Sequence, residues 1–164
     1  MQRDATDVVS VTVQAVGSGS ALHALMPGST LRSGDRFALA VTSSRPVFVY
    51  VGQRPAVGPV ELIYPPADTQ LASADGGRTL QLPASGQWFQ LDEKVGDETL
   101  YVLATTQRLD VGAAKQQLLS RTDGDVVRTR EPPPEVTERN RGEAIQAALA
   151  ADGTALLSFP LKHR

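Results

Sequence analysis

The sequence contains no cysteine and only two histidines, His23 and His163. Disulfides, iron–sulfur clusters and zinc sites built on thiolates are therefore excluded. Aromatic residues are scarce, at 5% of 164 residues, and 16 Lys and Arg nearly balance 18 Asp and Glu. The basic stripe of a general nucleic-acid-binding protein is missing. No run of 18 apolar residues, the length that spans a membrane, is present either.

The length and the 41% of hydrophobic residues are typical of one globular domain. A chain of this size buries about two thirds of its unfolded surface, so it needs neither metal nor disulfide to fold. Residues 1–7 lack the charged and then apolar order of a signal peptide. Because a cysteine-free chain suits both the cytoplasm and the periplasm, composition leaves the localisation open.

Up to residue 106, short apolar runs alternate with turn residues. Residues 8–16 alternate β-branched and small polar residues, which predicts a half-buried strand. Residues 47–51 and 100–105 are apolar on both faces, like strands in the middle of a packed sheet. Further strands are expected at 37–41, 60–64, 79–82 and 88–91. Strands at this spacing predict an antiparallel β-sandwich with its core at residues 8–106.

Helical spacing begins after residue 106. Asp110 can cap a helix whose apolar residues include Ala114 and Leu118. Residues 121–137 are polar and hold three consecutive prolines, which predict a stiff, extended connection.

A second helix is predicted from Asn140, where Glu143 is a capping-box partner. Ala144, Ile145, Ala148 and Leu149 supply its apolar face. Residues 155–159 are expected to form a last strand that rejoins a sheet edge. Residues 107–164 are thus a helical extension with a final strand, within a single domain over residues 1–164.

The residues form no recognisable catalytic set. Nucleophilic catalysis needs a base beside a serine, and both histidines are expected to be surface or partly packed side chains. P-loop and dinucleotide-binding motifs are missing. Asp68, Asp75 and Asp92 lack the spacing of a calcium loop. We therefore expect no enzyme, no cofactor and no metal site.

Two acidic pairs, Asp92–Glu93 and Asp97–Glu98, flank a short turn. Adjacent residues on a strand point to opposite faces, so neither pair converges on one substrate atom. Glu98 enters an apolar strand, and if it is buried it needs a partner. Arg36 or Arg78 could serve, which gives Glu98 a structural role.

Six blocks follow one another in a recognisable order. They are LRSGDRF at 31–37, VFVYV at 47–51, LIYP at 62–65, LQLP at 80–83, WFQLD at 88–92 and GDETLYVLA at 96–104. In this order residues 31–106 resemble the bacterial domain of unknown function 4384 family. The resemblance implies an Ig-like β-sandwich that often belongs to secreted or lipid-anchored envelope proteins. Family motif positions, expected in turns and strand pairing, are Gly34, Asp35, Pro83, Gly96 and Glu98.

With this resemblance the expected fold is a mainly β, Ig-like antiparallel β-sandwich with two additional α-helices and a C-terminal strand. The expected function is a non-catalytic protein-binding or scaffolding module of a bacterial cell-envelope protein. It would contact another envelope protein through sheet edges and the loops at 52–59 and 67–78. We expect an extracytoplasmic location, in the periplasm or at the outer membrane, and no nucleic-acid partner. A lipoprotein anchor needs an N-terminal cysteine, so it would lie outside this sequence.

A second interpretation is a small-ligand or polysaccharide-binding accessory domain. It requires exposed aromatic side chains, for which Tyr64 and Trp88 are the candidates. A hydrolase is the function that the sequence favours least.

Overall fold

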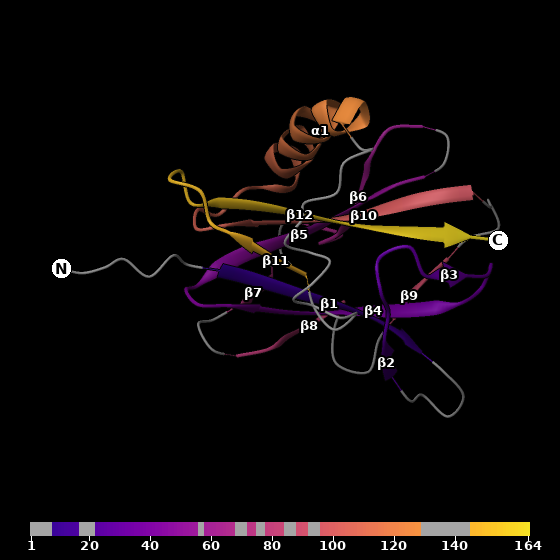
Figure 1. Cartoon of the computed structure of the whole chain (residues 1–164). Helices are drawn as coiled ribbons and strands as arrows, with labels where there is room; N and C mark the ends of the chain where they lie inside the picture. The colour runs from indigo at the N-terminus through magenta and orange to yellow at the C-terminus, as the bar shows by residue number, and fades with distance from the viewer. Residues whose placement is uncertain are drawn as a thin grey trace.

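Two β-sheets face each other, and one α-helix covers the outer side of one of them (Figure 1). The computed structural model describes residues 8–16, 22–55, 58–67, 72–74, 78–83, 88–91, 96–128 and 145–164. The described residues are mainly β, and the two layers confirm the predicted β-sandwich.

The first sheet has the strand order β11-β1-β4-β8, with β2 beside β1 and β9 beside β4. Its strands are β1 (Val8–Val16), β2 (Leu22–Ala24), β4 (Arg36–Ser43), β8 (Leu80–Leu82), β9 (Phe89–Gln90) and β11 (Ile145–Ala148). All of their pairings are antiparallel. Val9, Val11 and Val13 of β1 are buried, as the alternation of the sequence predicts.

The second sheet has the order β3-β12-β10-β5-β6, with β7 beside β5. Its strands are β3 (Thr30–Leu31), β5 (Val47–Arg54), β6 (Glu61–Tyr64), β7 (Ala72–Ala74), β10 (Gly96–Thr105) and β12 (Thr154–His163). The last strand, β12, pairs antiparallel with β10 along its whole length and parallel with β3 at its end. The final strand predicted at 155–159 is therefore confirmed, and it is longer than expected.

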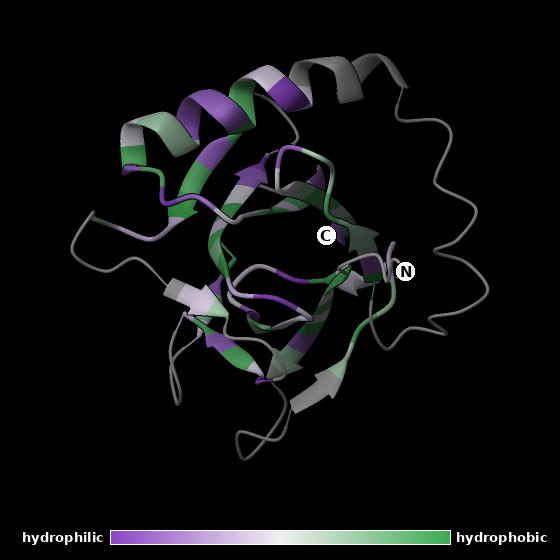
Figure 2. Cartoon of the chain, turned by 90° about the vertical axis from the view of Figure 1, so that its left-hand side faces the viewer, coloured by the Kyte–Doolittle hydropathy of each residue, from purple (hydrophilic) through white to green (hydrophobic). Residues whose placement is uncertain are grey.

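Strands β5 and β10 are buried on both faces, as the sequence predicts. Val49 and Val102 belong to the core between the sheets. Tyr50 and Leu103 point the other way and pack under the helix with Leu118. Figure 2 shows the helix lying across the outer face of this sheet. The helix explains why residues 47–51 of β5 and 100–104 of β10 are apolar at successive positions.

The helix, α1 (Val111–Arg128), begins at its predicted cap. Asp110 Oδ1 accepts a hydrogen bond from the Ala113 amide at 2.7 Å. Because the helix continues to Arg128, the extended connection predicted from residue 121 is wrong over residues 121–128. The three prolines at 132–134 lie outside the described residues.

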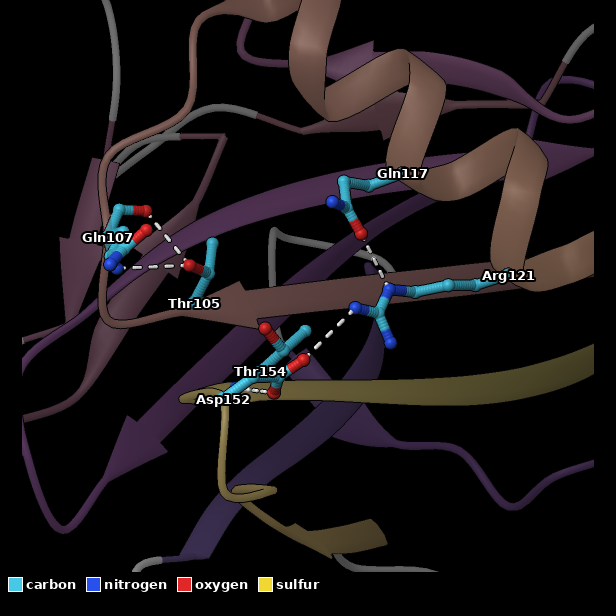
Figure 3. A network of polar contacts seen from close by, with 6 residues as sticks. All are labelled: Thr105, Gln107, Gln117, Arg121, Asp152 and Thr154. Carbon is cyan, nitrogen blue, oxygen red and sulfur yellow. Dashed lines mark hydrogen bonds and ion pairs between the residues drawn. The ribbon is translucent and has the colours of Figure 1, made fainter.

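A chain of polar contacts holds α1 to the turn before β12 (Figure 3). Arg121 forms an ion pair with Asp152 at 3.5 Å, and Gln117 accepts a hydrogen bond from Arg121 Nε at 2.7 Å. Asp152 also accepts the Thr154 amide at 3.0 Å. The helix is thus attached at its middle to the β11–β12 connection as well as to the sheet.

The second predicted helix is wrong where the structure describes it. Ile145–Ala148 forms strand β11, which pairs antiparallel with β1. Ile145 is buried and Gln146 is exposed, which is the alternation of a strand. The edge of β1 needs partners for its backbone amides and carbonyls, and this pairing supplies them. Residues 140–144, with the predicted cap, lie outside the described residues.

Candidate functional site

Four polar side chains meet where β12 ends, at one end of the core between the sheets. They are Ser33, Gln53, Glu98 and His163. Ser33 lies in the turn between β3 and β4, and the other three belong to strands β5, β10 and β12. We refer to these four residues as the polar network.

Strand register brings three members of the network together. His163 pairs with Gly96, two residues before Glu98, and Gln53 pairs with Leu100, two residues after it. Residues two apart on a strand share a face, and diagonal neighbours on adjacent strands lie within reach of long side chains. Because Leu100 is buried in the core between the sheets, the network lies at the end of that core.

The network runs from the surface into the interior. Ser33 is exposed, and its Oγ lies 2.9 Å from Nε2 of His163. Nδ1 of His163 lies 2.5 Å from Oε2 of Glu98, and their side chains are 0% and 2% exposed. The second oxygen of Glu98 accepts a hydrogen bond from the amide of Gln53. The sequence suggested Arg36 or Arg78 as partners of Glu98, and the structure supplies His163 and Gln53 instead.

The hydrogen-bond partners fix the roles of the two imidazole nitrogens. A carboxylate that faces Nδ1 accepts a hydrogen bond from it, so we assign the hydrogen of a neutral ring to Nδ1. The lone pair of Nε2 then faces Ser33, whose hydroxyl donates. Serine, histidine and carboxylate in this order form the arrangement that activates nucleophiles in hydrolytic triads.

The turn that carries Ser33 is held by its own hydrogen bonds. The Asp35 amide donates to the Arg32 carbonyl at 2.9 Å, and Asp35 Oδ2 accepts the Arg32 amide at 2.8 Å. Gly34 has a φ of 86°, a value that favours glycine. Its amide donates to the carbonyl of Leu91 at 3.1 Å. Ser33 therefore sits on a turn that is fixed at both ends.

The remaining motif residues mark strand ends. Gly96, with a φ of 132°, opens β10 opposite His163. Pro83 follows β8 through a cis peptide bond from Leu82. Neither residue contributes a side chain to the polar network.

The two candidate ligand-contacting aromatics are partly covered by the protein itself. Tyr64, at the end of β6, packs against the core, with its ring 6.4 Å from that of Phe89 and nearly perpendicular to it. Trp88 is half-buried just before β9, and residues 84–87 before it lie outside the described residues. Desolvation by burial raises the pKa of Tyr64 above its usual value of 10.0.

This raised pKa makes stability depend on pH in the alkaline range. Folded Tyr64 keeps its proton where the unfolded chain loses it, so its contribution is complete below pH 10.0 and is lost as the pH rises further. We expect Tyr64→Phe to show a shallower fall in unfolding free energy between about pH 8 and about pH 11 than the wild type. Urea denaturation at both pH values measures the two slopes, and equal slopes would contradict the expectation.

For several residues and segments that the sequence singles out, the described part of the structure gives no functional role. The described parts of the chain contain no group of three or more His, Cys, Asp or Glu residues that could hold a metal ion. They also contain no helix long and apolar enough to cross a membrane. Asp92 and Glu93, the side chain of His23, and parts of the loops at 52–59 and 67–78 lie outside what is described. Ala72–Ala74, within the second loop, forms strand β7.

Comparison with known proteins identifies one segment. Residues 30–108 match the family model described as Domain of unknown function (DUF4384). No curated protein and no solved structure matches the chain. The matched segment holds Ser33, Gln53 and Glu98, whereas His163 comes from β12, outside it. The polar network therefore joins the matched segment to the C-terminal strand.

Proposed function

The chain carries a domain of the DUF4384 family at residues 30–108, and on this premise we propose that it is a non-catalytic protein-binding or scaffolding module of a bacterial cell-envelope protein. Its location would be the periplasm or the outer membrane, and its sandwich would be of the Ig-like type. The observation that carries the proposal is an open strand edge on β12.

The backbone N–H and C=O groups of the even-numbered residues of β12 point away from β10. Near its end, the Lys162 amide donates to the Ser29 carbonyl and the Pro160 carbonyl accepts the Gly28 amide, at 2.9 and 2.8 Å. At its start, the Thr154 carbonyl accepts the Ala150 amide at 2.9 Å. Between these contacts, no strand among the described residues pairs with this side of β12. We call residues 156–158 the β12 edge.

The surroundings of the β12 edge suit an extended peptide. Ser158 is exposed and Leu156 is half-buried on the outer face. Among the described residues, Met26 is the exposed large hydrophobic side chain, with 56% of its surface accessible. It lies in the turn before Gly28, whose amide donates to the Pro160 carbonyl of β12. A peptide that adds as a strand gains backbone hydrogen bonds from the edge and an apolar contact from Met26. The proposed partner is a protein with an extended segment.

Ser158→Pro tests this edge, with Ser158→Ala as its matched control. Proline removes the outward amide and its ring blocks an added strand, while the ladder to β10 keeps its hydrogen bonds. The native Pro160 already occupies an equivalent position in β12. We expect Ser158→Pro to weaken partner binding at least about tenfold and Ser158→Ala to leave it unchanged.

The measurement is an affinity pull-down from an envelope extract of the source bacterium, followed by titration of the captured protein. Thermal melts of both variants confirm that they are folded. Equal binding by the two variants contradicts the role of the β12 edge. A wild-type bait that retains no stoichiometric protein contradicts the proposed function itself.

A further inference from the structure

We propose that Ser33 is an activated nucleophile, a modification site that accepts an acyl group from an activated ester or thioester. His163 acts as its base, and Glu98 is the positioning residue. This inference goes beyond the binding function and depends on a different part of the molecule, since the β12 edge contains none of these residues.

The geometry meets three requirements of an activated serine. The nucleophile must be accessible, and Ser33 is exposed on its turn. A base must lie within hydrogen-bond reach, and His163 Nε2 is 2.9 Å from the hydroxyl oxygen. A third group must orient the base, and Glu98 lies 2.5 Å from Nδ1 on the far side of the ring.

Gln53 helps to hold Glu98 in the orientation that positions His163. Its amide occupies the second carboxylate oxygen of Glu98, so both oxygens of the buried side chain have partners. A carboxylate held in this way stabilises the positive charge that appears on the ring when Nε2 takes a proton. The relay therefore favours transfer of the Ser33 proton to His163.

The transfer step balances without another reactant. The Ser33 oxygen forms a bond to the acyl carbon while its proton moves to His163 Nε2. The bond from the acyl carbon to the leaving oxygen or sulfur then breaks, and the leaving group takes the proton from Nε2. The products are an ester on Ser33, a free alcohol or thiol, and a neutral imidazole.

The surroundings limit both the donor and the fate of the acyl group. The Gly34 amide, next to Ser33, is engaged by the Leu91 carbonyl at 3.1 Å and is not free to stabilise an oxyanion. We therefore restrict the donors to activated acyl groups, which need less stabilisation. The His163 side chain is 0% exposed, and its Nε2 atom faces the exposed Ser33. An acyl group on Ser33 therefore blocks the path of water to Nε2. The acyl group is thus expected to remain, as a stoichiometric modification.

A cysteine in place of the serine gives a direct test, because the chain contains no other thiol. We compare Ser33→Cys with Ser158→Cys, an exposed position on β12 that serves as the control. Thiols beside an imidazole have a lowered pKa and react as thiolates. We expect iodoacetamide at about pH 6 to alkylate Ser33→Cys at least about tenfold faster than Ser158→Cys.

Adding Glu98→Gln separates activation from a merely structural role. With Gln53 donating to the oxygen of the new amide, its NH₂ group faces Nδ1 and moves the ring hydrogen to Nε2. A protonated Nε2 donates to residue 33 and cannot act as its base, the tautomer effect known from triads. We expect Ser33→Cys with Glu98→Gln to react at the control rate while its thermal melt still shows a folded protein.

The native serine is tested with p-nitrophenyl acetate and intact-mass spectrometry. The wild type is expected to gain one acetyl group, mapped to the peptide that holds Ser33, with release of one equivalent of nitrophenol. Ser33→Ala should gain none there and remain folded. Equal alkylation rates at positions 33 and 158, or no acetyl group on Ser33 of the folded wild type, overturn the proposal. Neither result affects partner binding at the β12 edge.

Discussion

A chain that lacks residues 138–164 is expected to show no cooperative unfolding transition. Strand β12 pairs with β10 from end to end, and Leu157, Phe159 and Leu161 are buried in the core between the sheets. Burying three such side chains contributes about 5–9 kcal/mol. The whole stability of a domain is about 5–15 kcal/mol, so little of it would remain.

Near-ultraviolet circular dichroism during a thermal melt measures this effect. Lys162→Ala is the matched control, since it changes an exposed side chain of the same strand and should alter stability by less than about 0.5 kcal/mol. A truncated chain that melts like the full-length protein would show that β12 is dispensable.

Glu98→Ala is expected to lower the free energy of unfolding by roughly 2–6 kcal/mol, that is, about 1–3 kcal/mol for each of the two polar groups that it leaves unpaired. The substitution leaves Nδ1 of buried His163 and the amide of Gln53 without their shared partner. Unpaired polar groups in the interior lose their hydration without gaining a hydrogen bond. Urea denaturation at neutral pH reports the loss as a lower midpoint.

Two variants control for side effects of this change. Asp97→Ala removes the exposed neighbour on the opposite face of β10 and should cost less than about 0.5 kcal/mol. Glu98→Gln keeps the shape and most hydrogen bonds, so it should cost less than Glu98→Ala. If Glu98→Ala and Asp97→Ala have equal midpoints, the polar network does not stabilise the fold.

The strands that could be predicted from the sequence are those in which the pattern of apolar residues itself shows which faces are buried. Residues 8–16 alternate because one face of β1 lies on the core. Residues 47–51 and 100–104 are apolar throughout because α1 covers the outer face of their sheet. The cap at Asp110 is equally local, since it depends on one side chain and one nearby amide.

The error at residues 145–148 comes from an ambiguity that short segments cannot resolve. Ile145 and Ala148 fit helical spacing, and Ile145 and Ala147 fit the alternation of a strand. The free edge of β1, more than a hundred residues earlier, decides between them. Pairing across such a distance leaves no trace in a window of a few residues.

The polar network was missed for the same reason. Ser33 and His163 are 130 positions apart, and nothing near either residue indicates the other. The one signal was Glu98, a charged residue inside an apolar strand, which needed a buried partner. Choosing that partner required the register between β10 and β12, which is set by the packing of the whole sheet.

The place of β12 in the second sheet also sets when the protein can fold during its synthesis. Gly96 pairs with His163, so the ribosome must add 163 − 96 = 67 further residues before β10 can complete its ladder. At roughly 5–20 residues per second, this takes roughly 3–13 s. During that interval the nascent chain presents the unpaired edge of β10 and the apolar side chains of its inner face. A chaperone that holds extended hydrophobic segments is expected to bind there until the last strand has emerged and can pair with β10.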